Sequence, residues 1–174
     1  MFLSPEEAKQ VGDKLDQYRG ELFKREYLPQ VRGFPGVREL FQRLHRDGVR
    51  IALASSAKED ELAAYKRAAG IEDLVETETA SEDVEHTKPA PDVFQAALEK
   101  LGNPDPRSVL VVGDSPYDGE AAARAGLRTI GLLSGGFTEQ ELRKAGCIAI
   151  YRDPADLLAH YDQSPIGQRL RQAA

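Results

Sequence analysis

The sequence has a single cysteine, Cys147, which excludes an internal disulfide and is compatible with a reducing cytoplasm. It lies in an apolar run, residues 147–150, so a buried, inert thiol is favoured over a nucleophile. No apolar stretch approaches transmembrane length, and the first residues lack the apolar core of a signal peptide. The chain also has no excess of positive charge: acids outnumber Lys and Arg by 29 to 23, and the net charge of −6 argues against nucleic acid or an anionic membrane as the main partner. These absences predict a soluble, cytoplasmic protein.

The chain of 174 residues is long enough for one domain, or for a core with a small accessory piece. From residue 37 onward, helical patterns alternate with short apolar runs typical of strands. The predicted strands cover residues 49–54, 74–75, 109–112, 129–133 and 148–151. This alternation predicts an α/β fold with a parallel sheet, right-handed crossovers and helices on both faces.

The first part of the chain reads as one amphipathic helix. A capping serine, a proline and two acids at residues 4–7 form a strong helix start. An apolar stripe follows at alternating spacings of three and four residues, and such a stripe needs a surface to pack against. Its members are Ala8, Val11, Leu15, Tyr18 and Leu22. Pro29 and residues 33–36 form a linker. The predicted parts are therefore an accessory helix at 4–30, a core at 34–162, and a polar, mobile tail at 163–174 that is short of apolar anchors.

The stretch VLVVGDSPYDGEAAARA, residues 109–125, organises the core. Its unbroken apolar run predicts a strand buried on both faces, and Asp114 and Asp118 follow in a tight loop before a small-residue helix. Ligands bind at the carboxyl ends of such strands, and two carboxylates four residues apart can converge on one Mg²⁺ ion. The alternative is that Asp114 only caps the helix and that Asp118 is a solvated acid in its first turn.

Two further polar features lie at strand ends or helix starts. Ser55 ends a predicted strand, so its hydroxyl and the backbone N–H groups that follow are suited to bind a phosphate oxygen. An equally good interpretation is that Ser55 or Ser56 caps the helix that begins near Lys58. Lys88 precedes a proline, which favours an extended backbone, and its ammonium can neutralise a phosphate or a carboxylate. The alternative for Lys88 is a solvated loop lysine. Together these residues predict a site for a metal-bound phosphoryl group.

The order of these motifs resembles the haloacid dehalogenase (HAD) superfamily. Ser55, Lys88 in TKPAPDVF, and Asp114 and Asp118 in VVGDSPYD are similar to its second, third and fourth motifs. Within it, residues 34–161 most resemble the phosphoglycolate-phosphatase-like and β-phosphoglucomutase-like members with a helical cap. The resemblance implies a three-layer, Rossmann-like parallel sheet and a small phosphorylated metabolite as substrate. It also implies that Ser55, Ser56 and Lys88 hold the phosphoryl group, that Lys88 steadies the nucleophile, and that Asp114, more directly, and Asp118 hold Mg²⁺.

One feature of the family is missing. Its first motif is a strand ending in D-x-D, which supplies the aspartate nucleophile and the acid/base aspartate. Asp13 and Asp16 lie inside the amphipathic helix at the wrong spacing. We therefore expect the nucleophile, the central strand and most of the cap to be absent, and the residue 4–27 helix to be the last part of the cap. Either the strands at 49–54 and 109–112 then pair directly, or another chain or a swapped segment fills the slot, so self-association is expected.

Two functional classes stay open: a Mg²⁺-dependent phosphohydrolase that is inactive alone or completed in trans, and a non-catalytic remnant that serves as a binding or assembly module. A phosphoacceptor receiver domain shares the architecture, but its acids come at the start of the chain, the reverse of the order here. Residues 135–136 resemble a flexible loop, not a nucleotide cradle. Solvent-exposed positions are predicted for the remaining polar candidates, Tyr27, Arg25, Arg32, His45, His86 and His160.

Overall fold

The computed structural model describes residues 5–173, so the predicted capping residue Ser4 lies outside the described part. The chain divides into two compact units, one up to Arg32 and one from Gly33 onward. The boundary falls at the beginning of the linker that the glycines and prolines of residues 33–36 predict.

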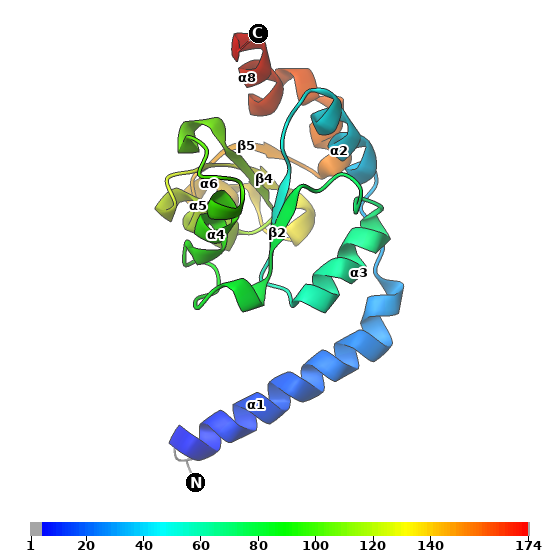
Figure 1. The fold of residues 1–174 in the computed structure, drawn as a ribbon, viewed down its shortest axis with the longest axis vertical. Coiled ribbons are helices and arrows are strands. Elements are labelled where there is room, and N and C mark those ends of the chain that lie inside the picture. The colour runs from blue at the N-terminus through cyan, green and yellow to red at the C-terminus, as the bar shows by residue number, and fades with distance from the viewer. Residues whose placement is uncertain (1–4, 174) are drawn as a thin grey trace. The chain divides into compact units, whose positions relative to one another are not determined.

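The first unit is helical. α1 (Pro5–Leu22) continues into a π-helical turn at Phe23–Tyr27 and a 3₁₀ turn at Leu28–Gln30, in agreement with the predicted helix. Figure 1 shows α1 as one continuous helix. The stripe residues Val11, Leu15 and Tyr18 are exposed. Between residues 5 and 173, no helix is both long and apolar enough to cross a membrane.

The second unit alternates helices and strands, as predicted. Its helices are α2 (Val37–Arg46), α3 (Glu59–Ala69), α4 (Asp92–Lys100), α5 (Pro116–Arg124), α6 (Glu139–Lys144), α7 (Pro154–Ala159) and α8 (Pro165–Ala173). Its strands are β1 (Ala52–Ala54), β2 (Thr77–Thr79), β3 (Leu110–Gly113), β4 (Arg128–Leu132) and β5 (Cys147–Tyr151). α3, α5 and α6 each return the chain from one strand to the start of a parallel neighbour, which makes this an α/β fold.

One predicted strand is misplaced. The apolar pair Leu74-Val75 was expected to be a strand, but the N–H of Leu74 donates to the carbonyl of Ile71 and closes a turn. Pairing with β1 begins only at Thr77, which lies opposite Ala52. The prediction is wrong because the side chains of a turn and of a short strand can both be apolar, and only the backbone partner distinguishes them.

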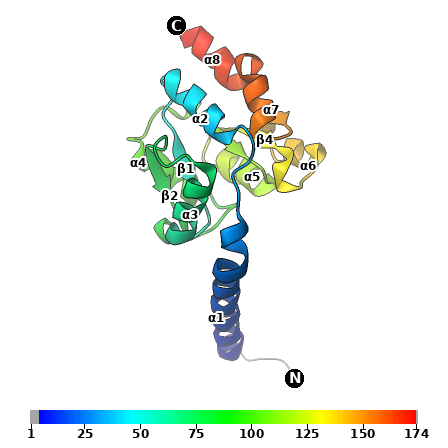
Figure 2. The same cartoon turned by 90° about the vertical axis from the view of Figure 1, so that its right-hand side faces the viewer.

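The strands form two parallel sheets, β1-β2 and β3-β4-β5. Among the described residues, β1 pairs only with β2, and β3 pairs only with β4, so the two strands that flank the expected central strand do not pair with each other. Figure 2 shows β1 and β2 beside α4, and β4 beside α5. An apolar cluster joins the two sheets, because Ala54 of β1 packs against a group that includes Val93, Phe94 and Val111.

β3 is not buried on both faces along its length, as its apolar run predicted. Val111 is buried in the cluster that joins the sheets, and Leu110 packs against the other core, but Val112 is 43% exposed. Val112 lies two residues after Leu110 on the same face of the strand, but it is not part of the apolar cluster that Leu110 packs against.

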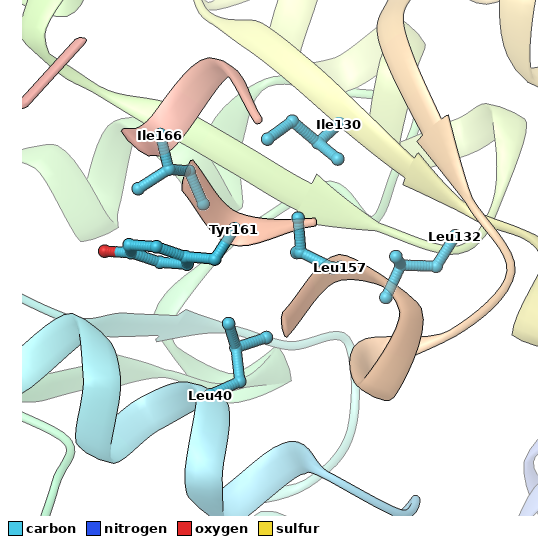
Figure 3. Packing of buried hydrophobic residues seen from close by; sticks show 6 residues of the cluster. All are labelled: Leu40, Ile130, Leu132, Leu157, Tyr161 and Ile166. Atoms are coloured by element: carbon cyan, nitrogen blue, oxygen red, sulfur yellow. The ribbon is translucent and has the colours of Figure 1, made fainter. Parts of the chain in front are cut away.

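A second core lies between β4, α2 and the C-terminal helices. It buries the side chains in Figure 3: Leu40, Ile130, Leu132, Leu157, Tyr161 and Ile166. The segment from Gln163 onward, predicted as a tail short of apolar anchors, instead forms α8, because Ile166 is buried in this core and Leu170 packs against it. Two apolar residues four apart are enough to attach one face of a short helix.

Candidate active site

Asp118 lies in the first turn of α5 and is buried, with 7% of its surface exposed. Its Oδ2 accepts hydrogen bonds from the Ser115 backbone N–H at 3.1 Å and the Ser115 hydroxyl at 2.7 Å. Ser115 is the N-cap residue, and the two form a reciprocal capping box. The alternative interpretation is therefore wrong on both points: Asp114 does not cap the helix, and Asp118 is not solvated.

Lys88 brings β1 and α5 together. Its Nζ lies 2.8 Å from Oδ1 of Asp118 and donates a hydrogen bond to the carbonyl of Ala54 at 2.9 Å. Ala54 is the last residue of β1, and the Lys88 Nζ also lies 5.3 Å from the ring centroid of Phe94. Only 17% of the Lys88 side chain is exposed, so the interpretation as a solvated loop lysine is wrong. A single ammonium group thus lies at the carboxyl end of β1 and at the start of the helix that follows β3.

Ser55 follows Ala54 directly, beside this ammonium. Its backbone N–H donates to the carbonyl of Thr79 at 3.0 Å, which continues the β1-β2 pairing, and its hydroxyl accepts from the N–H of Ala57 at 3.1 Å. The N-cap of α3 is Lys58 and has no side-chain cap, so Ser55 shapes the loop instead of capping the helix. Ser56 is exposed. The structure thus places Ser55 next to the lysine and leaves Ser56 on the surface.

Asp114 follows the last residue of β3 and is half-buried. Burial raises the pKa of this carboxyl, and the negative charge of Asp118 raises it further. For Asp118, burial also opposes ionisation, but the charge of Lys88 and the hydrogen bonds from Lys88 and Ser115 outweigh it and lower its pKa. Asp118 is therefore held as a stable anion, whereas at Asp114 the charge of Lys88 does not outweigh burial and the charge of Asp118, so an added cation would favour its ionised form.

The donor set suits Mg²⁺. Among residues 5–173, no group of three or more His, Cys, Asp and Glu side chains is arranged to hold a metal. Mg²⁺ needs only one or two carboxylates, because water and phosphate oxygens complete its octahedron. Asp114 is the more exposed of the two acids, whereas both oxygens of Asp118 already accept hydrogen bonds. The residues fit a hard cation bound chiefly through Asp114.

Two residues that build this site were not among the predicted ones. Ser115 orients Asp118, and the S-x-x-D pattern ahead of the helix was a capping-box signal that pointed to it. Gly135 follows β4, and a Cβ there would overlap the backbone carbonyl of Asp114. Residues 135–136, interpreted as a flexible loop, therefore include a close contact with the candidate site that no local pattern indicates.

The remaining candidates lie elsewhere. His86 is exposed and its Nδ1 lies 3.0 Å from Asp92, while His45 and His160 are exposed on the surface as predicted. Cys147 is buried, and burial raises the pKa of its thiol, so the prediction of an inert thiol agrees with its surroundings.

Lys88, Ser55, Asp114 and Asp118 lie around the carboxyl ends of β1 and β3 in an α/β fold of parallel strands, the place where such folds bind ligands. Residues 5–126 match the haloacid dehalogenase-like hydrolase family, and the chain belongs to this family. The resemblance inferred from the motifs is thereby confirmed.

Known relatives agree with this membership. "Probable phosphatase IndB" of Dickeya dadantii is 32% identical over 143 residues, which cover 81% of this chain and 61% of that protein. A phosphorylated carbohydrates phosphatase of Thermotoga maritima is 28% identical over 156 residues, covering 87% of this chain and 71% of the relative. The crystal structure of a hydrolase from Pseudomonas syringae matches with a TM-score of 0.77 and 33% identity, covering 94% of this chain and 75% of that one. The chain thus spans less than two thirds of the length of the first of these curated relatives and 71% of the second.

Proposed function

We propose that this chain provides the phosphate- and Mg²⁺-binding part of a phosphohydrolase that acts on a small phosphorylated metabolite. The observation that carries the proposal is the position of the Lys88 ammonium, held between the Ala54 carbonyl and Asp118 at the end of two parallel strands. Phosphoryl transfer depends mainly on positioning and charge neutralisation, which such a group supplies. The names of the relatives, two of them phosphatases, support the same activity.

Each residue has a distinct role in this proposal. Lys88 neutralises phosphoryl oxygens, and Asp118 and Ala54 hold it in place. The Ser55 hydroxyl donates to a phosphoryl oxygen while it accepts from Ala57. Mg²⁺ bound at Asp114 would supply further positive charge to the phosphoryl group. Ser56 contributes through its backbone N–H or, on rotation, its hydroxyl.

We further propose that the attacking carboxylate comes from a segment outside these 174 residues. No two aspartates in the sequence stand two residues apart. β1 and β3 each have one edge without a strand partner in the described chain, and backbone groups on such an edge pair readily with an added strand. An extended strand between them would form several hydrogen bonds, each stabilising by about 1 kcal/mol. It would also deliver its last side chain to the neighbourhood of Lys88.

A complementation assay tests this. The chain is incubated with Mg²⁺ and p-nitrophenyl phosphate, alone and with a synthetic strand peptide that ends in D-x-D. Turnover is expected only with the peptide, and is expected to be lost with Asp114→Asn or with a peptide ending in N-x-N. Asp105→Asn is the matched control, because Asp105 pairs with Arg107 outside the site. Turnover by the chain alone would refute the proposal that the nucleophile lies outside it. No turnover with any peptide would refute the proposal that an added strand between β1 and β3 supplies the nucleophile.

The second candidate function is a non-catalytic remnant that binds or self-assembles, and the exposed stripe of α1 favours it. Val11, Leu15 and Tyr18 present apolar surface that a second copy of the chain can cover. Sedimentation at micromolar concentration is expected to show dimers or larger species, and Leu15→Lys is expected to dissociate them. Gln10→Lys, at another exposed position of α1, is the matched control. A monodisperse monomer would contradict this function.

A further inference from the structure

A cavity of about 790 Å³ lies at the opposite end of the three-stranded sheet from the candidate active site. Arg128, the first residue of β4, lines it, and pairs in register with Leu110 at the start of β3. The candidate site instead follows Gly113 at the end of β3. The length of the strands therefore separates the two, and none of the residues assigned to phosphate or Mg²⁺ binding lines this cavity.

Three arginines from separate elements line the cavity: Arg107, Arg128 and Arg169. Arg107 lies in a 3₁₀ turn (Pro106–Ser108) capped by Asp105, and Arg128 begins a strand hydrogen-bonded on both sides. Arg169 lies on α8, which the buried Ile166 attaches to the core. The backbones that carry the three guanidinium groups are thus fixed by the fold.

One acidic group, Asp105, neutralises only part of this cluster. Arg107 forms an ion pair with Asp105 at 2.8 Å. Hydrogen bonds from Arg107 lower the pKa of Asp105, and the charge of Arg169 lowers it further, so Arg169 faces the same carboxylate at longer range. Within the described chain, neither Arg128 nor Arg169 has an acidic side chain within ion-pair distance. A protein with a net charge of −6 therefore has a locally positive cleft here.

The other lining residues supply different chemistry. Gln168 and Gln172 lie four residues apart on the same face of α8, and the amide nitrogen of Gln168 donates to the carbonyl of Gln163 at 2.8 Å, which leaves its oxygen to accept. Ile148 of β5 is exposed and offers an apolar surface to the cavity. Guanidinium groups bind phosphate oxygens in paired hydrogen bonds, whereas amides and an apolar side chain suit a polar heterocycle. The volume lies in the range of small-molecule sites, roughly 300–1,000 Å³.

We propose that this arginine cleft binds a nucleoside diphosphate or triphosphate, with the phosphates on the three arginines and the base against Ile148 and the two glutamines. The cleft is a binding site and not a second catalytic site, since it contains no nucleophile or general base among its lining residues. The proposal does not depend on the proposed phosphohydrolase activity.

Isothermal titration of the full chain with ADP, in EDTA and at low ionic strength, tests the proposal. ADP is expected to bind, and Arg128→Gln and Arg169→Gln are each expected to weaken binding about tenfold. Arg171→Gln is the matched control, because Arg171 is exposed on the same helix and does not line the cavity. It is expected to change the affinity less than about twofold. Equal weakening by Arg171→Gln, or no binding of ADP at millimolar concentration, would overturn the proposal.

Two further arms locate the ligand and define its chemistry. Lys88→Gln is expected to leave ADP binding unchanged. If this variant lost ADP binding while Arg128→Gln and Arg169→Gln kept it, ADP would bind in the candidate active site, and the proposal would be overturned. Inorganic tripolyphosphate is expected to compete with ADP, and adenosine is expected not to compete. Tripolyphosphate that binds as tightly as ATP would contradict the role given to Ile148 and the glutamines. Circular dichroism checks that every variant is folded.

Discussion

Replacing Lys88 by methionine tests the ion pair at the centre of the candidate site. The change keeps most of the apolar stem and removes the ammonium that lies 2.8 Å from Asp118, in a pair whose side chains are 17% and 10% exposed. Removing one partner of a fully buried pair costs about 3–5 kcal/mol, because the other charge stays buried without compensation. Asp118 keeps its two hydrogen bonds from Ser115. We therefore expect a loss of about 2–3 kcal/mol in the free energy of unfolding.

Urea unfolding followed by far-UV circular dichroism measures this loss. The control is Arg50→Met, which breaks a pair with Glu76 at 2.6 Å whose side chains are 54% and 46% exposed. Its contact is as short, but exposed pairs stabilise by only about 0.2–1 kcal/mol, so burial is the difference between the two variants. If Lys88→Met costs no more than Arg50→Met, the reasoning from burial is refuted.

The same variant has a predicted pH dependence. Because the folded pKa of Asp118 lies below its ordinary value of 3.8, its ionised form stabilises the fold above that pH, and this stability is lost as the pH falls through the folded pKa. The charge of Lys88 is a main cause of the lowered pKa. The stability difference between wild type and Lys88→Met is therefore expected at neutral pH and is expected to shrink below about pH 4. A difference that persists unchanged in acid would show that lost packing, not charge, is responsible.

Three further predictions follow from packing and burial. Leu157→Ala is expected to cost about 2–5 kcal/mol in urea unfolding because the side chain is fully buried, whereas Ile148→Ala at an exposed position is expected to cost far less; equal costs would contradict the described core. Gly135→Ala is expected to lower the free energy of unfolding by about 1–3 kcal/mol, because the added Cβ would overlap backbone atoms. Gly20→Ala has open space around it in a helix and is expected to raise the helicity measured by circular dichroism. A Gly135→Ala variant of unchanged stability would refute the close contact at Gly135. Burial raises the pKa of Tyr161 to about 12, so its neutral form stabilises the fold, and this stability is lost as pH rises from about 10 towards 12. Absorbance in an alkaline titration follows tyrosine ionisation, with Tyr161→Phe as the reference. Ionisation of Tyr161 together with the exposed tyrosines would contradict this prediction.

Local patterns predicted much of this fold. Each local signal lies within a few residues of the helix or strand that it specifies, so it could be interpreted without the rest of the chain. These signals are the helix start at residues 4–7, the apolar runs and the glycines that end helices. The predicted helix ahead of the linker and the alternation of helices and strands in the core are confirmed. The prediction that Ser55, Lys88 and the two aspartates form one site followed from a general property of parallel sheets, whose strands have their carboxyl ends at the same edge.

Local and long-range contacts both contribute to the failures. The turn at Leu74 is local, because its N–H donates to the carbonyl of Ile71 three residues earlier. Val112 is exposed and lies outside the apolar cluster that Leu110 packs against. The polar segment after Gln163 becomes α8 because Ile166 reaches a core built from α2, β4 and α7. The partners of Ile166 in α2 and β4 are far from it in sequence, and the choice among such partners depends on the whole packing arrangement.

The sequence by itself therefore determined the order and type of most of the elements and the kinds of groups at the candidate site, since these depend on periodicity, caps and side-chain chemistry. The tertiary structure alone decided that Lys88 bridges Ala54 and Asp118, that β1 and β3 belong to separate sheets, and that three arginines share a cleft. The physical reason is the distance along the chain between these partners. Their contacts form only when the backbone between them has folded, and no pattern of neighbouring residues encodes the separation of two side chains in space.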